Sequence, residues 1–202
     1  MLILHDHLTS GNGYKARLLL AQLGIPFKRI EYDMHGATRT PEYLAKVNAN
    51  GRIPVLELDD GTCLPESNAI IWYLAEGTKF VPEDRLARAQ ALSWMCFEQY
   101  SHEPNVATIR YWITHKVEMT PERVAAMPGK RAQGIAALGV MEQHLAKNKW
   151  FAGGRYSIAD IALYAYTHVA EEGGFDLKPY PALRDWLARV AGQPGYIPIT
   201  QG

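Results

Sequence analysis

Apolar residues follow two different patterns along this chain, and the change between them constrains the fold more than any other feature. Over the first 76 residues, strand-like runs alternate with helix-like runs in the order strand, helix, strand, helix, strand, strand, helix. The expected strands are residues 2–4, 27–32, 55–58 and 63–64, and the expected helices are residues 14–23, 41–44 and 67–76. This order predicts a sheet covered by helices.

From Arg85 onward the strand-like runs disappear, and short segments with glycine or proline separate helix-like runs. We therefore expect a domain boundary near residues 77–84, an α/β domain at residues 1–78 and an all-helical domain at residues 85–202. Pro104 is expected to kink the first long helix, and Thr120 to cap the next one. Apolar residues recur at helical spacing in two stretches, namely Leu86, Ala89, Leu92 and Cys96, and Ile135, Leu138, Met141 and Leu145.

The charge balance argues against a nucleic-acid or membrane-surface partner, because 21 basic residues balance 21 acidic ones. A small neutral or zwitterionic ligand fits this composition better.

Neither an apolar leader nor a membrane-spanning run is evident, and Cys63 and Cys96 are too few and too far apart for a disulfide framework or a zinc site. We expect a cytoplasmic protein without a metal, in which both cysteines are buried.

The first candidate site segment, Ser10–Lys15, lies between the first strand and the first helix. Its small polar side chains and glycines place hydroxyl, amide and backbone donors at the positive end of a helix dipole, a suitable place for an anion. The alternative is that Ser10 or Asn12 only caps the helix.

The second segment, Asn48–Pro54, places a proline directly before a strand. If the Ile53–Pro54 bond is cis, the backbone N–H and C=O of Ile53 are left at the sheet edge, where they can pair with a peptide ligand. The alternative is an ordinary trans proline at a strand start.

The third segment is Glu66-Ser67, at the start of the third helix. The Ser67 hydroxyl and the first N–H groups of the helix can bind a carboxylate, while Glu66 can face an ammonium group. The pair therefore suits the α-amino acid group of a ligand, although Ser67 could equally serve as a cap.

Four sequence segments occur in the order and spacing of one known family: SGNGYK, NANGRIPVL, LPESNAIIWYLAE and FAGGRYSIADIALYAY. On these segments the chain resembles the glutathione transferase superfamily throughout its length, and specifically its bacterial serine/asparagine branch, which is Nu-like or theta-like. The resemblance implies a thioredoxin-like N-terminal domain followed by a helical C-terminal domain. It also implies that Ser157 and Asp160 form a capping box with a structural role.

The resemblance implies a role for several residues in binding glutathione, the co-substrate. Ser10 matches the hydroxyl that donates to the glutathione sulfur, and Asn12 matches a second donor on the sulfur side. Ile53, before Pro54, would pair its backbone with the cysteinyl part. Glu66 and Ser67 would bind the γ-glutamyl end, and either Arg39 or Arg52 would bind the glycine carboxylate.

The resemblance further implies a homodimeric enzyme that activates the glutathione thiolate for attack on small hydrophobic electrophiles. We expect the electrophile near Leu8 and near one helix of the second domain, at Glu103, Ala107, Arg110 and Tyr111. Two alternatives are a glutathione-dependent disulfide-bond reductase, which needs no protein cysteine, and a non-catalytic interaction module built on the same fold.

Overall fold

The computed structural model describes residues 1–33 and 36–202. The chain forms two compact units, one made of Met1–Thr78 together with Gln193–Gly202 and the other of Lys79–Gly192. The first unit contains β1 (Leu2–Asp6), α1 (Gly11–Leu23), β2 (Phe27–Glu31), the 3-10 turn η1 (Ala37–Arg39), α2 (Pro41–Lys46), β3 (Val55–Glu57), β4 (Cys63–Pro65) and α3 (Ser67–Ala75). This is the order of strands and helices that the sequence predicts.

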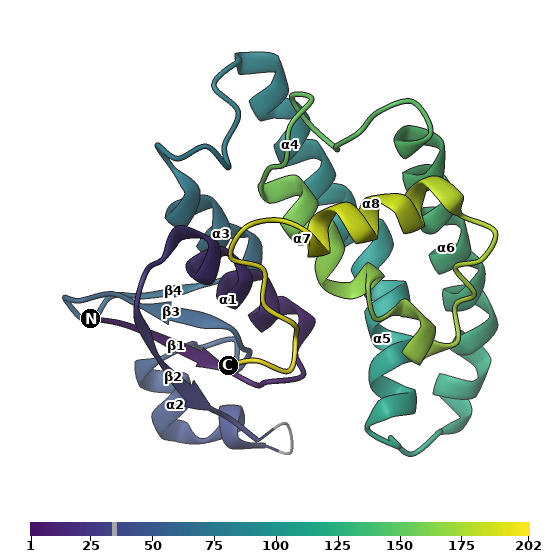
Figure 1. The fold of residues 1–202 in the computed structure, drawn as a ribbon. Coiled ribbons are helices and arrows are strands. Elements are labelled where there is room, and N and C mark those ends of the chain that lie inside the picture. The colour runs from purple at the N-terminus through teal and green to yellow at the C-terminus, as the bar shows by residue number, and fades with distance from the viewer. Residues whose placement is uncertain (34–35) are drawn as a thin grey trace. The chain divides into compact units, whose positions relative to one another are not determined.

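The four strands form one mixed sheet in the order β2-β1-β3-β4. β1 runs parallel to β2, and β3 runs antiparallel to both β1 and β4. Leu4 of β1 lies opposite Leu56 of β3, and both are fully buried. Helices α1 and α3 lie side by side on one side of the sheet, and α2 lies on the other (Figure 1).

Local sequence features account for the ends of these elements. Gly24 adopts a left-handed conformation, with a φ of 67°, and caps the C-terminus of α1, a role typical of glycine. The hairpin between β3 and β4 turns at Asp60-Gly61, where Gly61 has a φ of 85°. The Asp60 carboxylate also accepts a hydrogen bond from the Thr62 N–H at 2.9 Å, which is typical of a turn aspartate.

The last ten residues pack on the first unit, whereas the expected boundaries assigned them to the helical domain. The Tyr14 hydroxyl donates to the Ile197 carbonyl at 2.7 Å, and the Arg17 guanidinium donates to the carbonyls of Ile199 and Gln201. Because these donors lie on α1, the helix that begins at the candidate site, the tail belongs structurally to that unit.

The second unit consists of helices, as predicted. It contains α4 (Arg85–Phe97), a π-helical segment (Glu98–His102), α5 (Glu103–Thr114), α6 (Pro121–Leu145), α7 (Ile158–Thr167), a 3-10 turn (Ala170–Gly173) and α8 (Pro181–Ala191). Pro104 lies in the first turn of α5, directly after the π-helical segment. The kink expected at Pro104 stays a prediction. Thr120 caps α6, again as predicted.

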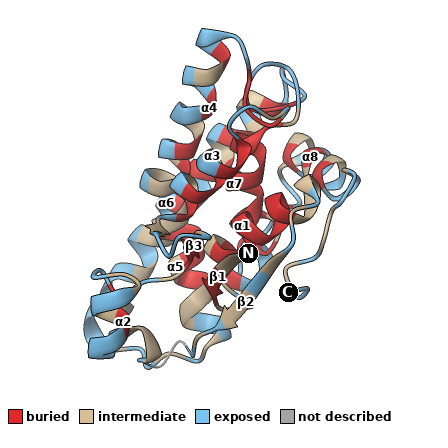
Figure 2. Cartoon of the chain, turned by 90° about the vertical axis from the view of Figure 1, so that its left-hand side faces the viewer, coloured by how far each residue is buried: buried red, intermediate tan, exposed pale blue. Residues whose placement is uncertain are grey.

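Helix α7 is the buried centre of the helical unit (Figure 2). Ser157 and Asp160 form the predicted capping box at its start. The Asp160 carboxylate also accepts a hydrogen bond from the Trp186 indole N–H at 2.9 Å. Burial raises the pKa of Asp160 to about 6, against the opposing effect of these donors.

Helix α4 packs against α7, and its residues Ala87, Ala91 and Met95 are buried. The other apolar stripe of α4 is exposed in this chain; it consists of Leu86, Ala89, Leu92 and Cys96. The expectation that both cysteines are buried is wrong, because Cys96 is exposed and Cys63 is partly exposed.

Candidate functional site

The loop between β1 and α1 carries Ser10. This residue is the N-cap of α1, because its Oγ accepts a hydrogen bond from the Gly13 N–H at 3.2 Å. The Ser10 N–H donates to the His7 carbonyl at 2.9 Å and closes the turn. A hydroxyl group has one proton and two lone pairs, so the cap uses a lone pair and keeps the proton for another acceptor. Capping and contact with an anion are therefore compatible roles for Ser10.

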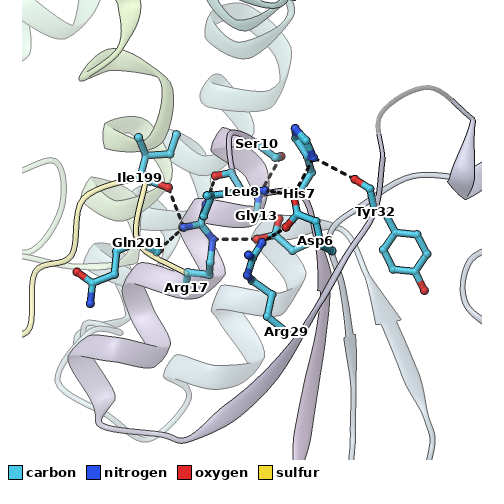
Figure 3. Close-up of polar contacts among 11 residues, drawn as sticks. Asp6, His7, Leu8, Ser10, Gly13, Arg17, Arg29, Tyr32, Ile199 and Gln201 are labelled. Carbon is cyan, nitrogen blue, oxygen red and sulfur yellow. Dashed lines mark hydrogen bonds and ion pairs between the residues drawn. The ribbon is translucent and has the colours of Figure 1, made fainter.

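The same loop is attached to the neighbouring strand β2 (Figure 3). The Leu8 N–H donates to the Glu31 carboxylate at 3.0 Å. His7 Nδ1 lies 3.0 Å from the Tyr32 carbonyl oxygen. These contacts fix the backbone on which Ser10 sits.

A buried ion pair lies beneath the loop. Arg17 Nε is 2.8 Å from Asp6 Oδ2, both side chains are fully buried, and the guanidinium also donates to the Leu8 carbonyl (Figure 3). Burial raises the pKa of Asp6 to about 6, although the Arg17 charge acts in the opposite direction, so the carboxyl is ionised at neutral pH. The carboxylate lies so close to Gly13 that a Cβ at that position would be 1.5 Å from Asp6 Oδ1.

The start of α3 meets the start of α1. The Ser67 hydroxyl donates to Asn12 Oδ1 at 3.1 Å, and Lys15 Nζ donates to Ser67 Oγ and to Asn68 Oδ1, each at 3.3 Å. Lys15 and Ser67 are buried. The structure thus brings together residues that the sequence assigns to two neighbouring parts of one ligand, the sulfur and the γ-glutamyl end.

Glu66, directly before Ser67, has a strained backbone. Its φ of 72° and ψ of 111° lie in a region of backbone conformation that residues other than glycine rarely adopt. Such a conformation typically costs about 1–3 kcal/mol of stability. Its side chain is exposed. The strained backbone sets the direction in which the chain enters α3, and an exposed carboxylate stands beside the N-terminus of that helix.

The Ile53–Pro54 bond is cis, which is one of the two alternatives left open by the sequence. Ile53 precedes β3 and lies outside the pairing of the described strands. The loop before it is held at Arg52, whose carbonyl accepts hydrogen bonds from the Tyr43 hydroxyl at 2.8 Å and from Asn48 Nδ2 at 2.9 Å.

The two arginines predicted to bind a carboxylate both lie on the exposed surface of the first unit. Arg39 donates to the Asn50 carbonyl at 3.1 Å and also lies against Gly51, so it helps to shape the loop before Ile53. Arg52 lies next to Ile53 in that loop. Their assignment to a glycine carboxylate stays a prediction.

Leu8 belongs to the first unit, whereas the four other residues predicted to contact an electrophile lie on α5 of the helical unit. Arg110 and Ala107 are buried, and Glu103 and Tyr111 are partly exposed. Arg110 Nε donates to the Glu172 carboxylate at 2.7 Å. The guanidinium of Arg110 is therefore engaged within the helical unit itself.

Tyr14 also carries a hydroxyl group near the start of α1. Its ring is fully buried, and its hydroxyl donates to the Ile197 carbonyl in the tail. Within residues 1–33 and 36–202, no group of three or more side chains is arranged to hold a metal ion. The described helices also include none that is long and apolar enough to cross a membrane.

Two family models match the chain: the N-terminal domain of glutathione S-transferase at residues 9–76 and the C-terminal domain of glutathione S-transferase at residues 113–194. The crystal structure of glutathione S-transferase from Pseudomonas fluorescens Pf-5 is 46% identical in sequence, with a TM-score of 0.94 over 99% of both chains. This chain belongs to the glutathione S-transferase family. The family accounts for both units, with the thioredoxin-like fold in the first and the helical fold in the second.

Two further similar proteins bear on the chemistry. The glutathione transferase URE2P6 from Phanerochaete chrysosporium, solved in complex with oxidised glutathione, is 27% identical, with a TM-score of 0.84 over 96% of this chain and 92% of that one. The disulfide-bond oxidoreductase YfcG of Escherichia coli K12 is 28% identical over 191 residues, which cover 91% of this chain and 87% of YfcG.

Sequence reasoning missed the buried residues that support the candidate site. Asp6, Arg17 and Lys15 are charged and buried, and none was singled out for a role. Their partners lie on other elements or in the tail. The only sequence signal was the position of Lys15, three residues after Asn12 and therefore on the same helix face.

Proposed function

We propose that this protein is a glutathione transferase, which ionises the thiol of bound glutathione and directs the thiolate to small hydrophobic electrophiles. The observation that carries this proposal is the contact between Asn12 and Ser67 at 3.1 Å. It joins the start of α1, predicted to face the sulfur, to the start of α3, predicted to face the γ-glutamyl group. Both helix N-termini favour negative charge.

The first step is ionisation of the thiol. A free cysteine thiol has a pKa of about 8.5, so only a few per cent of it is thiolate at neutral pH. Ser10 can donate its hydroxyl proton to the sulfur while its oxygen accepts from the Gly13 N–H. Together with an Asn12 donor and the helix dipole, a preference of about 2.7 kcal/mol for the anion would lower the thiol pKa by about two units.

The rest of the tripeptide would occupy the neighbouring groups. The γ-glutamyl carboxylate would lie on the Ser67 hydroxyl and the first N–H groups of α3, with Glu66 facing its ammonium group. The Ile53 backbone would pair with the cysteinyl part. Arg39 or Arg52 would bind the glycine carboxylate as the third anchor.

The second step is attack of the thiolate on an electrophilic carbon. The sulfur lone pair forms the new S–C bond, and in a substitution the leaving group departs with its bonding electrons. No nucleophile of the polypeptide takes part. We assign the electrophile to the surroundings of Leu8 and to α5, at Glu103, Ala107, Arg110 and Tyr111.

We further propose that the functional unit is a homodimer. The exposed apolar stripe of α4 supports this assignment, because Leu86 and Leu92 are 66% and 50% exposed in the single chain. Cys96 extends the stripe by one turn. A second copy of the chain would remove this surface from water, which is the main favourable term in such associations.

The alternative activity is reduction of disulfides, and the similarity to YfcG favours it as a second candidate. In that reaction the glutathione thiolate attacks one sulfur of the substrate disulfide and releases the other as a thiolate. A second glutathione thiolate then attacks the mixed disulfide and yields oxidised glutathione. The same site at Ser10 and Asn12 would serve both reactions.

Parallel assays with a chloro-nitrobenzene and with bis-hydroxyethyl disulfide test the proposal. We expect the chloro-nitrobenzene to be conjugated, and both Ser10→Ala and Asn12→Ala to lower kcat/KM. Turnover of the disulfide alone would favour the reductase. Absence of both activities, with no retention on immobilised glutathione, would refute a catalytic role.

A further inference from the structure

The guanidinium group of Arg17 connects the tail of the chain to the loop that carries Ser10 (Figure 3). Its Nη1 donates to the carbonyl oxygens of Ile199, at 2.9 Å, and Gln201. Its Nη2 donates to the carbonyl oxygen of Leu8, and the whole side chain is fully buried. Because a guanidinium group is planar and rigid, its donors hold the tail and the loop in a fixed relation to each other.

The carbonyl group of Leu8 lies in the middle of the turn that leads to Ser10. The Ser10 N–H donates to the His7 carbonyl at 2.9 Å and closes this turn, so the peptide group between Leu8 and Thr9 is its central one. The two common types of turn, I and II, differ mainly in the direction of the central peptide group. A hydrogen bond to its carbonyl oxygen therefore selects one direction, and with it the backbone position of Ser10.

The tail depends on hydrogen bonds from α1 for its attachment. None of its residues, 193–202, is buried, so apolar contacts contribute less to its attachment than they do in the core. Loss of the tail would remove the acceptors of Arg17 Nη1, and a buried donor without an acceptor is unfavourable. The guanidinium group would then turn toward water or another acceptor, and its hydrogen bond to Leu8 would weaken.

We propose that Arg17 is a positioning residue of the glutathione site, and that the tail acts through it to hold the turn that leads to Ser10. This inference rests on the proposed function. Arg17 acts on the peptide group of Leu8 and not on the sulfur. Attachment of the tail and binding of glutathione then strengthen each other, and thermodynamic linkage requires that each does so by the same factor.

A double-mutant cycle on glutathione affinity tests this role. The variants are a chain without residues 197–202, Arg17→Lys, and the combination of the two. Lysine keeps the positive charge beside Asp6, but its single ammonium group cannot replace the donors of a guanidinium fork. Each single change should raise the Kd for glutathione in calorimetric titration about tenfold, the effect of one hydrogen bond to a charged group. The combination should raise it no further.

Two separate effects of the tail and of Arg17 would multiply to about a hundredfold in the combined variant, and this result would overturn the proposal. An unchanged Kd in the shortened chain would overturn it too. Leu138→Ala, at a fully buried position of α6 in the helical unit, is the matched control for a loss of stability. It should lower the Tm and leave the Kd unchanged; an equal loss of affinity in this control would show that general destabilisation is the cause.

Hydrogen exchange in the unaltered protein tests the same linkage without any variant. The Gln201 N–H donates to the Pro198 carbonyl at 3.0 Å within the tail. Saturation with glutathione should slow its exchange about tenfold, which is the factor by which loss of the tail raises the Kd. If glutathione binds and this exchange rate does not change, only the inference fails. If the unaltered protein does not bind glutathione, the proposed function fails as well.

Discussion

Gly13 is the residue at which a single methyl group should have the largest effect on the site. In most helix positions, replacing glycine by alanine stabilises a protein by up to about 1 kcal/mol, because glycine loses more backbone entropy on folding. At residue 13, however, the new Cβ would lie 1.5 Å from Asp6 Oδ1 and 2.4 Å from Asp6 Cγ. Non-bonded carbon contacts need about 3.5 Å, so the carboxylate would have to move by roughly 2 Å.

That movement is costly, because the Asp6 side chain is fully buried and ion-paired with Arg17. Overpacking of a buried site costs about 1–3 kcal/mol, and a contact this close belongs at the upper end. After subtraction of the gain in helix propensity, we expect Gly13→Ala to lower the free energy of unfolding by about 2 kcal/mol. The shift should also displace Ser10, whose Oγ accepts from the Gly13 N–H, and weaken glutathione binding.

Urea unfolding and calorimetric titration with glutathione measure both effects. The matched control is Gly139→Ala in α6, where an added Cβ meets nothing within 4 Å. The control should be stabilised by up to about 1 kcal/mol and should bind glutathione normally. A Gly13→Ala variant that is as stable as the control, with unchanged glutathione affinity, would refute the reasoning.

Three further predictions concern other parts of the molecule. Burial lowers the pKa of His168 to about 4, so between pH 6.5 and 4 the unfolded chain takes up a proton that the folded protein does not. The unaltered protein should therefore lose stability as the pH of urea unfolding is lowered through this range. The variant His168→Asn should lose about 3 kcal/mol less. Leu92→Asp on the exposed stripe of α4 should convert the proposed dimer to a monomer in sedimentation experiments, and an unchanged mass would place the interface elsewhere. Deletion of residues 197–202 removes the carbonyl groups that accept hydrogen bonds from Tyr14 and Arg17. It should lower the free energy of unfolding by at least about 2 kcal/mol in the same urea assay. Equal stability of the shortened chain would contradict the role of the tail.

The order of elements in the first unit could be predicted because its signals are local. Gly24, Pro54 and the pair Asp60-Gly61 act through their own backbone preferences, so a few neighbouring residues decide where a helix ends or a strand begins. The capping box at Ser157 is local in the same sense. Such features do not depend on what the element later packs against.

The burial of a helix face could not be predicted in the same way. On α4 two apolar stripes run side by side, and the spacing of residues is the same for a stripe that faces a core and for one that stays exposed. The stripe of Ala87, Ala91 and Met95 is buried, while Leu86 and Leu92 are exposed. The way in which α4 packs in the folded helical unit decides between them.

In the candidate site, too, local features could be predicted and contacts between distant residues could not. The sequence indicated Ser10, Asn12 and Ser67 through their positions at helix starts. It could not reveal that Lys15 reaches Ser67, or that Arg17 reaches Ile199, because these contacts join residues 52 and 182 positions apart. Such contacts depend on how α1, α3 and the tail pack together.

The ultraviolet titration of bound glutathione tests the central claim most directly, because it reads the ionisation of the sulfur itself. The account predicts that the thiol, when bound to the unaltered protein, titrates about two units below its free value of about 8.5, and that Ser10→Ala returns its pKa toward that value. A bound thiol that titrates at its free value, or a lowered pKa that Ser10→Ala and Asn12→Ala both leave in place, would contradict the account.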